Sequence, residues 1–191
     1  MTPLVTIGID PGLTNLGLCA LVFEPGVKIH EVFDLVRPPK DLREGSRLAL
    51  LSARAEAFCL PLLAERATSK LKIQAAIEGY DYKGFSTLQM AEITGCLKAL
   101  LARLAIPLVV VSPSQVKKFA VGDSQADKSK IMARYQMDNE HLADARALAG
   151  VAAVYLTGTS ELRRELEVIA ALRRPKKVKA PRVKKLAGIS V

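Results

Sequence analysis

Val5-Thr6-Ile7-Gly8-Ile9-Asp10-Pro11-Gly12 is an apolar, β-prone run that ends in a proline and a glycine. This pattern is typical of a strand followed by a turn. Asp10 is the last residue of that strand, and a carboxylate at the end of a buried strand must be solvated, paired or bound to a metal ion. The first strand therefore ends at a candidate functional residue.

A second stretch, Ala75-Ala76-Ile77-Glu78-Gly79, repeats this arrangement. One such acid is ordinary, because strands end at the surface of a protein. Two acids from different strands, each followed by a glycine within two residues, favour a shared site in which the glycines let another group approach the backbone.

Working outward from these strands, the hydrophobic periodicity predicts an α/β domain around a mixed, five-stranded sheet flanked by helices. Short turns between the first three strands indicate an antiparallel meander. The predicted strands cover residues 5–10, 16–23, 27–36, 73–78 and 108–111, and the predicted helices cover 42–66, 86–104, 139–156 and 160–172, with short helices beginning at 113 and 128.

Three expectations concern single elements. Pro61 should kink or end the helix over 42–66. The continuous β-branched run at 108–111 predicts a strand that is buried on both faces. The helix over 86–104 is a candidate dimer face, and its periodic apolar residues should face the core: Leu88, Ile93, Leu97, Leu100 and Leu104.

The helix that begins near Asn139 supplies further candidate site residues. Asn139 is a plausible N-cap, which puts His141 and Asp144 in the first turns and, three residues apart, on one face. Because most of this helix is apolar, Asp144 is not explained as an ordinary charge on a solvated helix face. The neighbouring acids Asp138 and Glu140 remain alternative ligands.

Carboxylates that converge from two strand ends and a helix make a hard, oxygen-rich site. Such a donor set favours Mg²⁺ or Mn²⁺ over zinc. A pair of divalent ions about 4 Å apart suits phosphodiester hydrolysis. His141 could be a metal ligand or a proton-transfer group.

Composition indicates a globular protein. The chain has 191 residues, of which 50% are hydrophobic and 25% charged, and we expect one nuclease domain over 1–172. No apolar stretch approaches the length of a membrane span, and no secretory signal is visible. The odd, scattered cysteines (Cys19, Cys59 and Cys96) indicate buried thiols in a reducing compartment rather than disulfides or a zinc site.

The net charge of +9 is concentrated in a basic segment at 173–191, which we expect to be a flexible tail that binds nucleic acid. Without its eight basic residues the chain has 20 basic against 19 acidic residues and is close to neutral. A solubility tail and an anionic membrane surface are the alternatives, although no apolar anchor accompanies the charges. The eight residues are Arg173, Arg174, Lys176, Lys177, Lys179, Arg182, Lys184 and Lys185.

Five motifs occur in the order seen in the RuvC family of Holliday-junction resolvases, which this chain resembles over about residues 4–156. They are Ile9-Asp10-Pro11-Gly12, Ile77-Glu78, Gln115-Val116-Lys117, Asp127-Lys128-Ser129 and His141-Leu142-Ala143-Asp144-Ala145. The resemblance implies a ribonuclease H-like fold and a homodimer that cleaves four-way DNA junctions with two Mg²⁺ ions in each active site.

By this resemblance, the metal-site residues are Asp10, Glu78, His141 and Asp144, and Lys117 and Lys128 lie near the scissile phosphate. A cation there would stabilise the charge of the transition state. Without the resemblance, both lysines would be read as solvent-facing.

The segment that follows Glu78 departs from the family pattern. Its aromatic residues Tyr80, Tyr82 and Phe85, with Lys83 between them, could contact bases at the junction, although core or dimer packing explains them equally well. The added Asp81 could repel phosphate. These departures and the basic tail are more typical of a phage or organellar variant than of a bacterial housekeeping enzyme.

Three alternatives share some of these features. They are a related nuclease acting on RNA, flaps or three-way junctions; an actin-like ATPase; and a nucleic-acid-binding module without activity. The chain lacks the second phosphate loop of an ATPase, and its intact carboxylates argue against an inactive module. The expected location is the cytoplasm or the nucleoid, the host cytoplasm for a phage protein, with an organelle as a further option.

Overall fold

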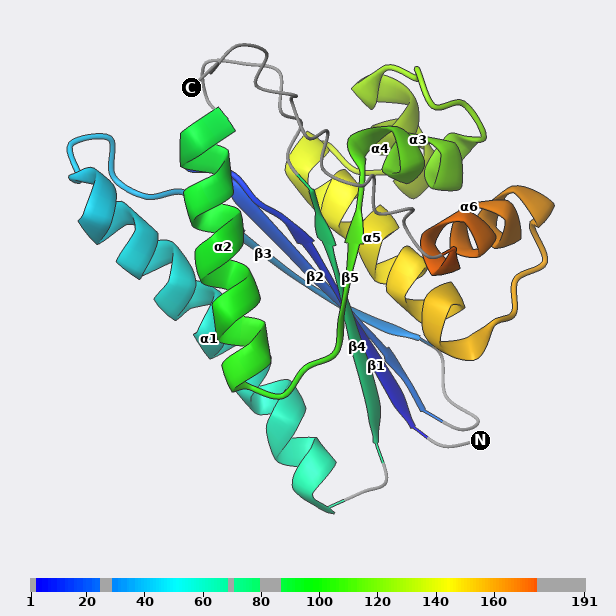
Figure 1. The fold of residues 1–191 in the computed structure, drawn as a ribbon, viewed down its shortest axis with the longest axis horizontal. Helices are drawn as coiled ribbons and strands as arrows, with labels where there is room; N and C mark the ends of the chain where they lie inside the picture. The colour runs from blue at the N-terminus through cyan, green and yellow to red at the C-terminus, as the bar shows by residue number, and fades with distance from the viewer. Residues whose placement is uncertain (1–2, 25–28, 69–70, 80–86, 175–191) are drawn as a thin grey trace, which may run out of the picture.

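The computed structural model describes residues 3–24, 29–68, 71–79 and 87–174, which form one sheet with helices on both faces (Figure 1). The strands are β1 (Leu4–Asp10), β2 (Leu16–Phe23), β3 (His30–Val36), β4 (Lys72–Glu78) and β5 (Leu108–Val111). The helices are α1 (Glu44–Thr68), α2 (Thr87–Arg103), α3 (Pro113–Val121), α4 (Lys128–Tyr135), α5 (Glu140–Thr157) and α6 (Arg163–Arg173). The predicted α/β class and order of elements are confirmed.

The strands lie in the order β3-β2-β1-β4-β5. The strands β1, β2 and β3 form the predicted antiparallel meander, whereas β4 and β5 run parallel to β1. Ile9 of β1 pairs with Ile77 of β4. The next residues, Asp10 and Glu78, therefore end neighbouring parallel strands at the same edge of the sheet.

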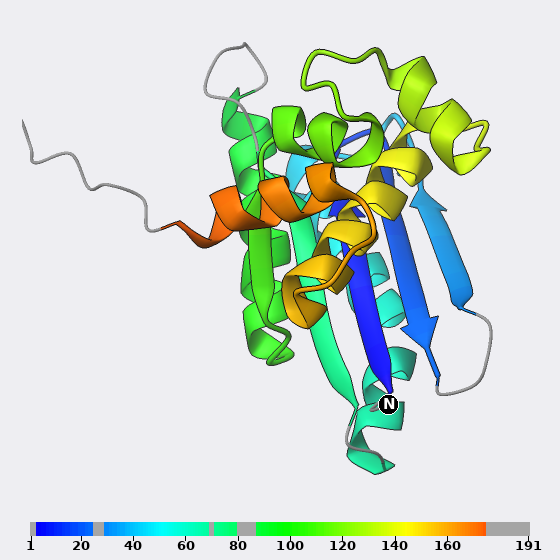
Figure 2. The same ribbon diagram turned by 90° about the vertical axis from the view of Figure 1, so that its right-hand side faces the viewer.

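The two faces of the sheet are covered by different helices (Figures 1 and 2). Val5, Ile7 and Ile9 of β1 pack into the core beneath α1 and α2. Side chains alternate along a strand, so Gly8 and Asp10 face the opposite side, where α5 lies on the sheet beneath α3, α4 and α6. The same alternation directs Glu78 toward α5.

Two expectations about single elements were wrong, and of the two outcomes expected at Pro61, a kink or a helix end, the helix end does not occur. Helix α1 does not end at Pro61, because Cys59 and Leu62 are buried on either side and hold the backbone against the core. Leu88 is 79% exposed, since the first turn of α2 begins beyond the covered part of the sheet. Val110 is 40% exposed because β5 is an edge strand, which α1 and α2 leave uncovered.

The cysteines are free thiols; Cys19 and Cys59 are buried, as expected, whereas Cys96 is partly exposed. Burial raises the pKa of the Cys19 and Cys59 thiols to about 12, so both remain protonated. Within the described ranges, no helix has the length and apolar character needed to cross a membrane.

Candidate active site

Helix α5 lies unusually close to β1 and β2 because glycines face it. A Cβ atom on Gly8 would lie 1.9 Å from the carbonyl oxygen of Ala145, and one on Gly17 would lie 2.3 Å from that of His141. Only residues without a side chain fit at these two positions. The close approach sets the first turns of α5 beside the end of β1. Glycine within a strand pattern is the sequence signal that could have revealed this contact.

The start of α5 is fixed by the predicted N-cap. The side-chain oxygen of Asn139 accepts a hydrogen bond from the backbone N–H of Leu142 at 3.1 Å. His141 and Asp144 follow in the first turns. Asp144 is only 7% exposed, which agrees with the apolar character of its helix.

Asp10 and His141 form a short side-chain contact. Asp10 is 5% exposed, and its Oδ2 lies 2.7 Å from Nδ1 of His141. Which partner carries the proton depends on the state of the imidazole. The hydrogen bond to Asp10, opposed by burial, raises the pKa of His141 above its ordinary value.

Glu78, which is partly buried, and the buried Asp144 complete a cluster of carboxyl groups. Burial, repulsion from Asp10 and Asp144 and a hydrogen bond with Asp10 raise the pKa of Glu78 to about 9. Burial and repulsion from Asp10 raise the pKa of Asp144 to about 6. Three acids from β1, β4 and α5 thus share one site, where their negative charges are poorly compensated.

Glu78→Gln is expected to stabilise the metal-free protein at pH 8. The folded state raises the pKa of Glu78 from 4.5 to about 9, so stability present below pH 4.5 is lost as the pH rises toward 9. One pKa unit is worth about 1.4 kcal/mol. Urea unfolding in EDTA should therefore show the Gln variant more stable than wild type by more than about 1.4 kcal/mol at pH 8.

The difference in free energy of unfolding between the Gln variant and wild type should shrink at pH 4, where Glu and Gln are both neutral. It should also become smaller at pH 8 when Mg²⁺ is added. A wild-type protein that is the more stable of the two at pH 8 in EDTA would contradict this account of the carboxyl cluster.

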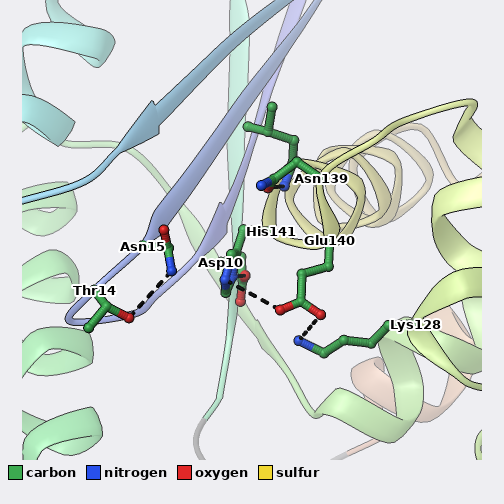
Figure 3. A network of polar contacts seen from close by, with 8 residues as sticks. Asp10, Thr14, Asn15, Lys128, Asn139, Glu140 and His141 are labelled. Atoms are coloured by element: carbon green, nitrogen blue, oxygen red, sulfur yellow. Dashed lines mark hydrogen bonds and ion pairs between the residues drawn. The ribbon is translucent and has the colours of Figure 1, made fainter.

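Lys128 supplies a positive charge near the cluster, and the Glu140 carboxylate lies between Lys128 and His141 (Figure 3). The Nζ atom of Lys128 lies 3.0 Å from Oε2 of Glu140. Burial lowers the pKa of Lys128, but the hydrogen bond to Glu140 and the charge of Asp144 outweigh it, so the net shift is upward. The same hydrogen bond lowers the pKa of Glu140.

The donor set fits a hard divalent cation. Its oxygens come from three carboxylates, and a cation would relieve the repulsion that raises the pKa of Glu78 and Asp144. In the described part of the chain, no three His, Cys, Asp or Glu side chains are already arranged around a common ion position. Instead, Asp10 forms hydrogen bonds with His141 and Glu78.

The remaining predicted site residues are not brought into this cluster. Lys117 lies half-buried on α3, and among the described residues no hydrogen bond or ion pair joins it to the carboxylates. Arg173 ends α6 and stacks on the Tyr155 ring, and Arg174 follows it as an exposed residue. The other DNA-contact predictions lie outside the described residues: Tyr80, Tyr82, Lys83, Phe85, Lys176, Lys177, Lys179, Arg182, Lys184 and Lys185.

Residues 6–151 match the family model described as "Crossover junction endodeoxyribonuclease RuvC". The chain belongs to the RuvC family. The RuvC of Bradyrhizobium diazoefficiens is 30% identical over 156 residues, which span 77% of this chain and 85% of that protein. The RuvC of Rhodococcus opacus is 29% identical over 128 residues, which span 66% and 65% of the two chains.

Solved RuvC structures share the fold. The Thermus thermophilus RuvC structure superposes with a TM-score of 0.59 at 22% identity and covers 80% of this chain and 95% of that one. T. thermophilus RuvC in complex with Holliday junction substrate gives 0.60 at 23% identity, covering 80% and 94%. The resemblance read from the ordered motifs is thereby confirmed, as is the ribonuclease H-like class.

Helix α6 lies beyond the residues that match the RuvC model. Val168 and Ile169 bury it in the same apolar cluster as α3 and α5. Arg164 donates hydrogen bonds to the carbonyls of Phe119 and Ala120, which cap the end of α3. The helix is therefore an integral part of the fold, and the basic segment begins at its last turn.

Proposed function

We propose that this protein is a metal-dependent, structure-selective DNA endonuclease that resolves four-way junctions by symmetric paired nicks. The observation that carries the proposal is the cluster of buried Asp10, buried Asp144 and partly buried Glu78, three acids from separate elements at one edge of the sheet. Membership of the crossover junction endodeoxyribonuclease family supports the same activity.

In the proposed mechanism, Asp10, Glu78 and Asp144 would hold two Mg²⁺ ions, for which Mn²⁺ could substitute, and His141 would be a fourth ligand. Ions bound there would supply an activated water and stabilise the leaving oxygen. Lys128 would contact the non-bridging oxygens of the phosphate and offset their charge. Asp144 is buried on α5, whose backbone lies against β1 at Gly8.

The proposed partner is branched DNA, chiefly the four-way junction. A relative of the same fold has been solved in complex with a Holliday junction substrate. The junction has approximate two-fold symmetry and needs two matched cuts, so we propose that a C2 homodimer presents one site to each of two opposed strands. The proposed location is where such DNA occurs, in the cytoplasm or on the nucleoid.

The decisive assay is cleavage of a labelled four-way junction by the purified protein, with and without Mg²⁺. Mapping the cuts on all four strands should show nicks at symmetric positions on two opposed strands. Linear duplex, flap, three-way and structured RNA substrates of equal length are the controls. Preferential cleavage of RNA would replace the proposal with the RNA-processing alternative, and ATP hydrolysis without cleavage would favour the ATPase.

Removal of residues 175–191 is expected to weaken junction binding and reduce its salt dependence. The deletion removes six basic residues: Lys176, Lys177, Lys179, Arg182, Lys184 and Lys185. Each phosphate contact contributes a slope of about −0.9 to the plot of log K against log salt on duplex DNA. Fluorescence anisotropy measures junction affinity and its salt dependence, over a range of about 50 to 200 mM salt. An unchanged slope would show that the tail does not engage DNA.

A further inference from the structure

The Glu140 carboxylate faces two cationic or potentially cationic groups of the site at once (Figure 3). Its Oε2 lies 3.0 Å from Nζ of Lys128, and its Oε1 lies 3.6 Å from Nε2 of His141. The other ring nitrogen of His141 contacts Asp10 at 2.7 Å. A continuous row of polar contacts thus runs from Lys128 through Glu140 and His141 to the first carboxylate of the site.

The positions of Lys128 and Glu140 in their helices explain why the lysine needs this partner. Lys128 is the first residue of α4, where the helix dipole is unfavourable to a cation, and its N-cap Asp127 makes no side-chain cap. Glu140 is the first residue of α5, where the dipole favours an anion. The first turns of α4 and α5 lie side by side, so Glu140 of α5 can pair with Lys128 of α4.

Stability alone does not account for this pair. The side chains of Lys128 and Glu140 are 50% and 41% exposed, and ion pairs this open to solvent add little to the free energy of folding. What the pair does change is conformational freedom, because a half-exposed lysine otherwise samples many rotamers. The effect of Glu140 should therefore be found in the geometry of the site.

We propose that Glu140 is a positioning residue of the active site, with one carboxylate oxygen holding the Lys128 ammonium near the acid cluster and the other orienting the His141 ring so that Nδ1 faces Asp10. This inference rests on the proposed function. Histidines that ligate metals commonly present their second ring nitrogen to a carboxylate, which fixes the orientation of the ring. Glu140 occupies that place behind His141 and at the same time restrains Lys128.

Two variants of Glu140 separate a positioning role from an effect on the start of the helix. Glu140→Gln removes the charge, and Glu140→Asp keeps the charge and the helix-dipole benefit but is too short to span both partners. We expect both variants to lower kcat for junction cleavage about 10- to 100-fold, as losses of outer-shell carboxylates do. The Kd for the junction, measured without metal, should be nearly unchanged. An Asp variant with wild-type kcat would show that Glu140 serves only the helix.

A matched control is available in the Lys118–Glu167 pair, which joins α3 to α6 at 3.3 Å with similar exposure, 43% and 47%. Glu167→Gln should leave kcat unchanged. If it lowers kcat as much as Glu140→Gln, the loss reflects surface charge and the inference is wrong.

A double-mutant cycle with Lys128→Met tests whether Glu140 acts through the lysine. We expect the decreases in kcat of the two single variants not to multiply in the double variant. Once Lys128 is replaced, Glu140 has no ammonium group to position, so its own replacement should cost little more. Fully multiplicative losses would overturn this half of the inference. An increase in activity or DNA affinity on Glu140→Gln would show instead that the acid competes with phosphate for Lys128.

A measurement independent of cleavage is offered by the histidines, of which the chain has two, His141 and the exposed His30. Ring ¹⁵N and ¹H signals of the metal-free protein should shift for His141 in both Glu140 variants, while those of His30 stay in place. Unmoved His141 signals would overturn the inference. If the wild-type protein cleaves no junction, the proposed function fails, whereas these signals still decide whether Glu140 orients the ring.

Discussion

Asp10→Asn and Glu78→Gln are each expected to abolish junction cleavage while the protein still folds and binds the junction. Loss of outer-shell carboxylates already costs about 10- to 100-fold, and these two acids are proposed to ligate the ions directly, so kcat should fall by more than about 100-fold. Burial supports the assignment: Asp10 is 5% exposed, and the two side chains that hydrogen-bond to it, His141 and Glu78, are themselves proposed metal ligands.

The measurement is single-turnover cleavage, paired with binding of metal-free junction. Affinity for the junction should change little, because phosphate contacts by Lys and Arg side chains dominate DNA binding. Asp138→Asn is the control, an exposed acid in the turn just before α5. If Asp10→Asn loses binding as severely as cleavage, its role is structural and the metal-site assignment is wrong.

Gly8→Ala is expected to be the most destabilising single-methyl change at the interface between β1 and α5. The added Cβ would lie 1.9 Å from the Ala145 carbonyl oxygen and 2.4 Å from the Ala149 amide nitrogen. Both are backbone atoms of α5, so no side-chain rotation relieves the clash and the whole helix must move. We expect a loss of about 3 kcal/mol or more, at the upper end of overpacking effects.

The same displacement should reduce cleavage, because α5 carries His141 and Asp144. Urea unfolding and single-turnover cleavage measure the two effects. Gly95→Ala is the matched control: Gly95 is exposed inside α2 with no atom within 4 Å of an added Cβ, and the change should stabilise by about 0.5–1 kcal/mol. Ala145→Gly should not rescue Gly8→Ala, since the clash is with backbone. A Gly8→Ala variant of wild-type stability would refute the close approach.

Much of the site follows from local patterns in the chain. Asp10 and Glu78 were found because each ends an apolar strand, and Asp144 because its helix is otherwise apolar. The N-cap Asn139 was predicted from residue type and is present. Such signals are local, since a strand end or a cap depends on a few neighbouring residues.

Other features escaped prediction because they depend on distant segments. The exposure of Leu88 and Val110 follows from where α1 and α2 end over the sheet, which helical periodicity alone does not reveal. The continuation of α1 past Pro61 depends on the core that anchors the helix on both sides. Glu140 looked like a possible metal ligand, yet it pairs with Lys128 from another helix.

By itself, then, the amino-acid sequence determined the strands, the helices and their caps, and which acids had to be accounted for, because hydrogen bonding and periodicity act over short distances along the chain. Only the tertiary structure decided that these acids meet. The parallel register of β1 and β4 aligns Asp10 with Glu78, and the glycine contact seats α5 with Asp144 beside them. The raised pKa values of Glu78 and Asp144 arise from that meeting, since burial and repulsion act through space.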